Sequence, residues 1–174
     1  MKIKSYIFLP VIFISGVVFL WFVQFSIPTL YGADSYLHIR IADIIRTEGF
    51  IGNNFHWARY SIFNGNYSDK DFLLHLLLIP FTLFRNIFFG GKVAAFILAS
   101  FAYFAFYWII KRTVRTYLIV PALICFFLSD HFIQALSRLR PMVLVIALTL
   151  FGIYFLITKN YLGVFIVTFL YTYT

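Results

Sequence analysis

Long apolar runs alternate with short polar segments along the whole chain. The apolar runs do not alternate with polar residues, as they would in the strands of a transmembrane barrel, and are apolar on all sides. Such a run satisfies its backbone in lipid only as a helix, so the pattern predicts an all-α fold, a polytopic bundle of transmembrane helices. We expect one transmembrane module over residues 1–174 with about five spans, at residues 6–30, 93–110, 117–137, 142–157 and 161–174.

The segment between the first two spans, residues 31–92, is predicted to be an external loop that carries amphipathic juxtamembrane helices. Its first part has apolar residues at helical spacing, which are Leu37, Ile41, Ile44 and Ile45. This spacing predicts a short helix on the membrane surface. We expect Asp34 or Ser35 to be its N-cap and Gly49 to supply the left-handed residue at its end.

Residues 72–84 form a second apolar piece in this loop, and they are too few for a full span. The basic residues of the short loops do not decide whether the piece crosses, because either arrangement puts six inside and four outside. Its length favours an interfacial or re-entrant segment, and Gly90 and Gly91 are expected to break the chain after it. The first apolar run is too long for a cleaved signal, which predicts a cytoplasmic N-terminus.

Composition supports the membrane interpretation and excludes a soluble core. The chain has 174 residues, of which 63% are hydrophobic and 11% charged, and its mean hydropathy is +0.93. The net charge of +8 comes from scattered basic residues, so we expect the lipid bilayer rather than nucleic acid as partner. Residues 161–174 begin a helix without a polar end, which predicts the N-terminal part of a longer protein.

Five of the six carboxylates gather within residues 34–71, which marks this part of the chain as a candidate site. Asp34 lies where the first predicted span reaches the outer face. It is interpreted either as an N-cap or as a carboxylate that accepts a proton or binds Mg²⁺ or Mn²⁺ through hard oxygen ligands. His38 lies one helical turn away on the same face, and Arg40 is nearby.

A second polar group lies farther along the chain. Asp130 and His131 are predicted at the outer end of a span, either as polar residues at the lipid boundary or as additional metal ligands beside Asp34. Arg138 and Arg140 follow in the next turn. They are interpreted as interface anchors, or as a clamp for phosphate oxygens, which match the guanidinium fork.

The run from Asp34 to Arg40, followed by Ala42 and by Gly49 and Phe50, resembles the first external loop of GT-C glycosyltransferases. The resemblance is strongest to the catalytic subunit of oligosaccharyltransferase and its bacterial and archaeal relatives. It implies transfer of a sugar or oligosaccharide from a polyprenyl-phosphate-linked donor on the extracytoplasmic face, in a prokaryotic plasma membrane or an ER membrane. Residues 137–142 stand where the family has a second acidic motif, and its acids are missing, which favours a distant member with another sugar acceptor.

The sequence therefore leads to a hypothesis with named residues. Asp34 is the predicted catalytic residue, and the predicted substrate-binding residues are His38, Arg40, Arg138 and Arg140. The predicted metal ligands are Asp34, Asp130 and His131. The alternative hypothesis, from the short length and the missing motif, is a non-catalytic membrane scaffold subunit or a transporter fragment.

Overall fold

The computed structural model describes residues 2–51, 57, 60 and 67–174, and every element in them is helical. The rest of the predicted external loop, residues 52–56, 58–59 and 61–66, lies outside the described residues. The described elements are α1 (Lys2–Phe25), α2 (Ala33–Glu48), α3 (Phe72–Leu78), η2 (Ile79–Leu83), α4 (Ile87–Thr113), α5 (Thr116–Cys125), α6 (Asp130–Ser137), α7 (Pro141–Ile157) and α8 (Tyr161–Tyr171). The all-α prediction is confirmed for this part of the chain.

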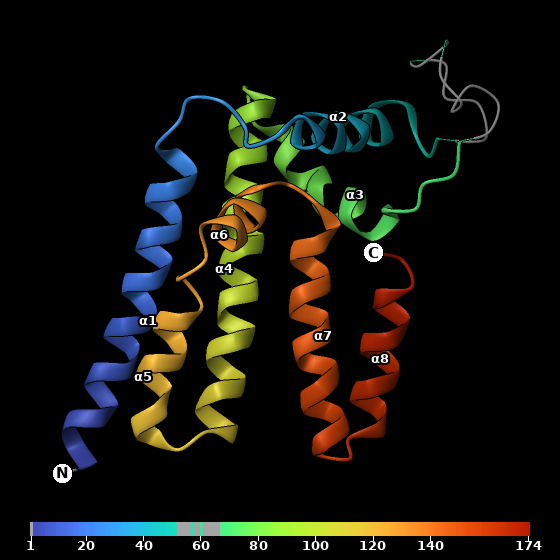
Figure 1. The fold of residues 1–174 in the computed structure, drawn as a ribbon. Helices are drawn as coiled ribbons and strands as arrows, with labels where there is room; N and C mark the ends of the chain where they lie inside the picture. The colour runs from blue at the N-terminus through green and yellow to red at the C-terminus, as the bar shows by residue number, and fades with distance from the viewer. Residues whose placement is uncertain (1, 52–56, 58–59, 61–66) are drawn as a thin grey trace.

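The long helices run side by side, and α2 lies across one end of them (Figure 1). We call this the α2 end. It holds the last turn of α1, the short helices α3 and η2, and the first turns of α4 and α7. The α4–α5 and α7–α8 connections lie at the opposite end. Residues 72–84 thus begin and finish at the α2 end, as expected for a segment that does not cross.

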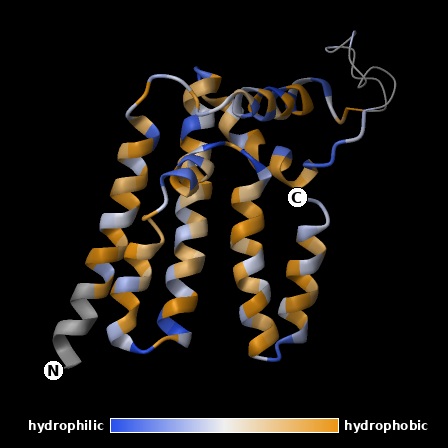
Figure 2. Ribbon diagram, viewed as in Figure 1, coloured by the Kyte–Doolittle hydropathy of each residue, from blue (hydrophilic) through white to orange (hydrophobic). Residues whose placement is uncertain are grey.

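Membrane-span candidates are fewer than the five predicted. Among the described residues, only α4 is by itself long and apolar enough to cross a bilayer, and the pair α5 and α6 passes only when counted together. The remaining predicted spans correspond to shorter apolar helices, at Leu9–Phe25, Pro141–Ile157 and Tyr161–Tyr171. Apolar residues nonetheless cover most of the lengths of these helices (Figure 2).

Residues 117–137, which are predicted to form one span, are not one continuous helix. Helix α5 ends at Cys125, α6 begins at Asp130, and their axes differ by 76°. The break has a local cause, because Ser129 is the N-cap of α6 and its Oγ accepts a hydrogen bond from the Phe132 amide at 3.3 Å. The carboxylate of Asp130 also lies in the first turn, where the helix dipole favours negative charge.

The prediction that Gly90 and Gly91 break the chain is wrong, because both lie inside α4. The helix starts earlier, where the Asn86 side chain accepts hydrogen bonds from two backbone amides of the first turn. The glycines allow close packing instead. A Cβ on Gly90 would lie 2.0 Å from the carbonyl oxygen of Phe81, and one on Gly91 would lie 3.2 Å from Leu30. Their missing side chains let η2 and the α1–α2 connection approach α4.

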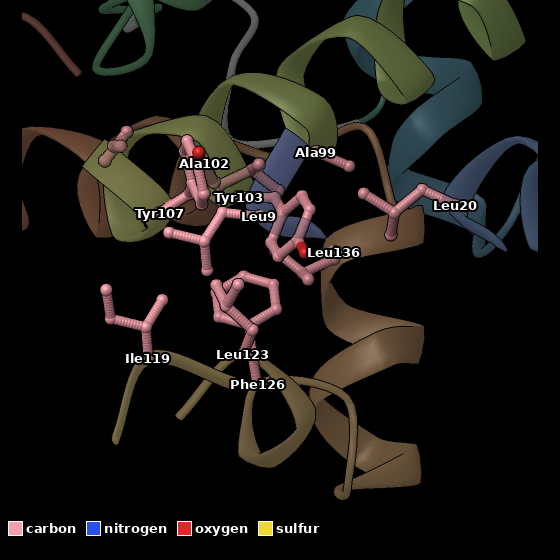
Figure 3. Packing of buried hydrophobic residues seen from close by; sticks show 13 residues of the cluster. Leu9, Leu20, Ala99, Ala102, Tyr103, Tyr107, Ile119, Leu123, Phe126 and Leu136 are labelled. Carbon is pink, nitrogen blue, oxygen red and sulfur yellow. The ribbon is translucent and has the colours of Figure 1, made fainter. Parts of the chain in front are cut away.

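The described residues form three apolar clusters, of which two are relevant to the docking of α2 and of the helices behind it. The larger one joins α1, α4 and α5 around the fully buried Tyr103 (Figure 3). The other fixes α2 on α3 and α4 through Ile39, Ala42, Leu74 and Leu78, which are all fully buried. Of the predicted apolar stripe, only Leu37 is largely exposed, at 49%. Helix α2 is therefore docked on the bundle by one complete face, which fixes the direction of the polar side chains beside that face.

Candidate functional site

The first turn of α2 is built differently from the prediction. Neither Asp34 nor Ser35 is the N-cap; Gly32 takes that position, with φ of 74°, and no side chain caps the helix. A positive φ is accessible to glycine without steric cost, so the chain turns into α2 there. The carboxylate of Asp34 is thereby left free of backbone amides. Gly49 does end the helix with a positive φ of 89°, although its ψ of −173° is not that of the left-handed helical region.

The connection between α6 and α7 crosses the start of α2 and is fastened to it. Tyr31 and Arg138 form an isolated parallel β-bridge, and the Leu139 amide donates to Oγ of Ser35 at 2.9 Å. Ser35 in turn donates to the carbonyl oxygen of Tyr31. The aliphatic part of Arg138 packs against Gly32, where a Cβ would lie 3.4 Å from Cδ. Two segments about a hundred residues apart in sequence thus form one unit.

This arrangement places Arg140 directly against Asp34, and the two side chains form an ion pair. The pair lies at the α2 end, with side-chain exposures of 47% for Asp34 and 38% for Arg140. Nε of Arg140 is buried and has no partner within the described part of the chain. Three of the predicted site residues, Asp34, Arg138 and Arg140, are therefore brought together. The α6–α7 connection supplies both of these arginines.

A second polar group lies beneath the same face of α2. Nδ1 of His38 is 2.9 Å from Nε2 of His75, and Nδ1 of His75 is 2.8 and 2.7 Å from the two carboxylate oxygens of Asp69. His38 is 7% exposed and His75 is 2% exposed. Burial, and then the neighbouring His75, lowers the pKa of His38, while the carboxylates of Asp71, Asp34 and Asp69 oppose that shift.

The sequence analysis missed His75 and did not single out Asp69. The available signal was a histidine inside the otherwise apolar run Phe72–Leu78, where a polar side chain needs a buried partner. The spacing gave no indication of which partner, because His38 is 37 positions away. His38, which is predicted to bind substrate, is the outer member of this hydrogen-bonded chain.

Arg40 is directed to a different cluster. Its guanidinium lies 2.7 Å from Asp43, which also binds Arg46 at 2.8 Å. Arg46 continues to Thr82 of η2, with Nε 2.8 Å from its Oγ1. Arg40 also lies over the ring of Trp57, at 5.9 Å from its centroid. This exposed cluster stabilises the middle of α2 and its contact with η2, so Arg40 is committed to partners other than the Asp34 group.

Asp130 and His131 are exposed on the first turn of α6, where Gln134 donates to the Asp130 carboxylate at 2.8 Å. Within the described residues, no three His, Cys, Asp or Glu side chains are grouped so that they could hold a metal ion. Asp34, Asp130 and His131 are therefore not assembled into one set of ligands. The guanidinium on the Asp34 carboxylate also does not fit a Mg²⁺ or Mn²⁺ site, which needs that oxygen and several more.

Comparisons of the chain with protein-family models, with curated proteins and with solved structures found no match.

Proposed function

We propose that this chain is the membrane-embedded N-terminal module of a GT-C-like glycosyltransferase. The complete enzyme would transfer a sugar or oligosaccharide from a polyprenyl-phosphate-linked donor to an acceptor hydroxyl. In this proposal α1, α4, the broken pair α5 and α6, α7 and α8 cross the bilayer, and α2, α3 and η2 lie at the extracytoplasmic surface. The proposed compartment is a prokaryotic plasma membrane or an ER membrane.

The observation that supports the proposal most is the ion pair of Asp34 with Arg140. Asp34 is the first residue of the run that carries the resemblance. Its carboxylate does not cap the helix and is about half exposed, and the Arg140 guanidinium lies beside it. Arg138 lies next to it on the same connection. A reaction that releases a polyprenyl phosphate develops negative charge on the leaving group, and arginine binds phosphate oxygens with two parallel hydrogen bonds.

The proposed roles follow from these positions. Arg138 and Arg140 bind the phosphate of the donor, and Asp34 holds Arg140 in place until the donor arrives. The acceptor oxygen then attacks the anomeric carbon, the bond between that carbon and the phosphate oxygen breaks, and the phosphate leaves between the two guanidinium groups. Because the described ligands around Asp34 do not fit a divalent cation, no step of this mechanism uses Mg²⁺ or Mn²⁺.

The test is transfer of a radiolabelled hexose from a polyprenyl-phosphate donor by membranes that contain the complete protein. We expect Asp34→Asn to lower the rate about 100-fold, because Arg140 loses the carboxylate that holds it in position for the charge developing on the donor phosphate. Asp43→Asn is the matched control, because Asp43 lies on the same helix and pairs with Arg40 and Arg46. Equal rates for wild type and Asp34→Asn would contradict the proposal.

A charge-swapped variant separates catalysis from folding. Asp34→Arg combined with Arg140→Asp keeps an ion pair at this position, so we expect it to restore the stability of the helix docking but not the transfer. Recovery of transfer by the swap would show that the pair only fastens the α6–α7 connection to α2.

The second candidate is a non-catalytic scaffold subunit, which one observation favours. Arg140 already neutralises Asp34, so the pair can serve as a structural link between the α6–α7 connection and α2. Release of free polyprenyl phosphate from the labelled donor by the purified wild-type protein would exclude the scaffold. An inactive wild-type protein in which the charge swap preserves assembly with partner subunits would support it.

A further inference from the structure

The hydrogen-bonded chain of Asp69, His75 and His38 joins residues 69–75 to helix α2, two parts of the sequence that have no local reason to meet. Asp69 precedes α3, His75 lies on α3, and His38 lies on α2. The contacts at 2.7–2.9 Å are within normal hydrogen-bonding distance. We propose that these residues form a proton relay whose outer atom, Nε2 of His38, accepts the proton of the acceptor hydroxyl. This inference rests on the proposed transferase and names the proton acceptor of its site.

The carboxylate sets the direction of the relay. An ionised carboxylate only accepts hydrogen bonds, so Nδ1 of His75 carries a proton toward Asp69. In neutral His75 the other nitrogen, Nε2, is then an acceptor, and the proton between the two rings must come from Nδ1 of His38. Neutral His38 consequently has its lone pair on Nε2. That atom makes no hydrogen bond to any residue that the structure describes.

The charges around the relay favour a neutral resting state that can take one proton. Burial and His75 hold the pKa of His38 below its usual value, so His38 is an unprotonated base at neutral pH. Asp34, Asp69 and Asp71 are the carboxylates that act on it. Tyr67 also lies against Asp69 and Asp71, and because burial and these carboxylates raise its pKa, it remains a neutral phenol.

His38 is better suited than Asp34 to accept the proton. Asp34 and His38 are four residues apart on α2, so their Cβ atoms lie roughly 5–6 Å apart on one face. The Asp34 carboxylate is already engaged by the Arg140 guanidinium, so it is less available to an acceptor hydroxyl. His38 is linked through His75 to the carboxylate of Asp69, whose side chain is 14% exposed, so the positive charge formed on proton uptake can move to a compensating group.

The step balances as follows. The acceptor oxygen forms a bond to the anomeric carbon, and the bond from that carbon to the phosphate oxygen breaks with its electron pair on the phosphate. The hydroxyl proton moves to Nε2 of His38. The Nδ1 proton of His38 moves to Nε2 of His75, and the resulting imidazolium of His75 stays beside the carboxylate of Asp69. His38 is then the catalytic residue, and His75 and Asp69 act through it.

The tautomers test the relay without any transfer assay. In the ¹⁵N-histidine-labelled full-length protein in nanodiscs, NMR at neutral pH should show protons on Nδ1 of both His38 and His75. Exposed His131 is the internal reference, and His38→Gln and His75→Gln assign the signals. Asp69→Asn should shift the His38 population toward the Nε2-protonated tautomer, whereas Asp71→Asn should leave it unchanged. A wild-type His38 that carries its proton on Nε2 overturns the relay, even where Asp69→Asn fails to fold.

The pH profile of transfer tests the catalytic role. Wild type should lose kcat/KM on the acidic side as His38 becomes protonated, and His38→Gln should remove that limb together with about 100-fold or more of the rate. Asp69→Asn should lower kcat more than it raises KM. An unchanged acidic limb in active His38→Gln would overturn the inference and leave the proposed function standing. Correct tautomers in a protein without any transfer would overturn the proposed function instead.

Discussion

Two polar groups contact α2, the ion pair of Asp34 with Arg140 and the hydrogen-bonded chain of Asp69, His75 and His38, and they differ in their exposure to water. Asp34 and Arg140 are about half exposed, so water screens their attraction, and such pairs contribute little to folding. His38 and His75 are 7% and 2% exposed, the side chain of Asp69 is 14% exposed, and hydrogen bonds link the three side chains. The exposed pair can be opened by a ligand at low cost, whereas the hydrogen-bonded chain cannot lose a member cheaply. The difference suggests that binding occurs at the first group and that the second remains fixed.

Removing the Asp69 carboxylate should give the largest effect. Asp69→Ala leaves Nδ1 of His75 without an acceptor and also removes the bond from the Asp71 amide to Asp69, which is 3.1 Å long. We expect a loss of about 1–3 kcal/mol in the free energy of unfolding. Asp34→Ala should cost about 1 kcal/mol or less, since its partner remains solvated. Denaturant unfolding of the purified protein, followed by tryptophan fluorescence, measures both.

The control for Asp69→Ala is Asp71→Ala. Asp71 binds this region through its backbone, where its carbonyl oxygen accepts from the His75 amide at 3.1 Å, and alanine keeps that bond. A loss in Asp34→Ala that equals the loss in Asp69→Ala would remove the distinction between the two groups.

The pH dependence of the free energy of unfolding should also distinguish the two groups, by less than the carboxylate substitutions do. The folded pKa of His38 lies below its unfolded value of about 6.5, so between these values the unfolded chain binds more protons. Stability should therefore be full above about pH 6.5 and should fall as the pH decreases toward the folded pKa, by at most about 1.4 kcal/mol per pH unit. His38→Gln should flatten this decrease, and Arg140→Gln should leave it in place. Unfolding curves between pH 5 and 8 test the difference.

Apolar periodicity predicted much of the fold. It gave the all-α class, the helix at residues 33–48 and the placement of residues 72–84 at one end, because these depend on local pattern and length. The break before Asp130 and the glycines inside α4 were missed, since a serine cap and a close helix contact outweigh apolar length and glycine propensity. Both errors come from single residues whose role is set by a neighbour in space.

The sequence predicted site residues only where the resemblance to GT-C enzymes, or an expected position at the same end of the bundle, indicated them. Asp34, Arg138 and Arg140 were expected on one side, yet the ion pair itself follows from the bridge between Tyr31 and Arg138. His75 has no sequence motif around it. Its role depends on the docking of α2 against α3 by Ile39, Ala42 and Leu74, a packing solution that periodicity does not determine.

The coupling energy between two side chains of the same group should give the smallest difference between the two groups, and the most specific one. A double-mutant cycle with Asp34→Asn and Arg140→Gln measures the exposed pair, and we expect a coupling energy of about 0.2–1 kcal/mol that largely disappears near 1 M salt. The matching cycle with His38→Gln and Asp69→Asn should give a larger energy that salt hardly changes, because that coupling passes through hydrogen bonds of the buried His75 ring. A salt-independent coupling above about 2 kcal/mol for Asp34 and Arg140 would mean that the pair is a structural link between α2 and the α6–α7 connection. In that case a phosphate ligand could not open it at low cost, and the scaffold would become the better interpretation.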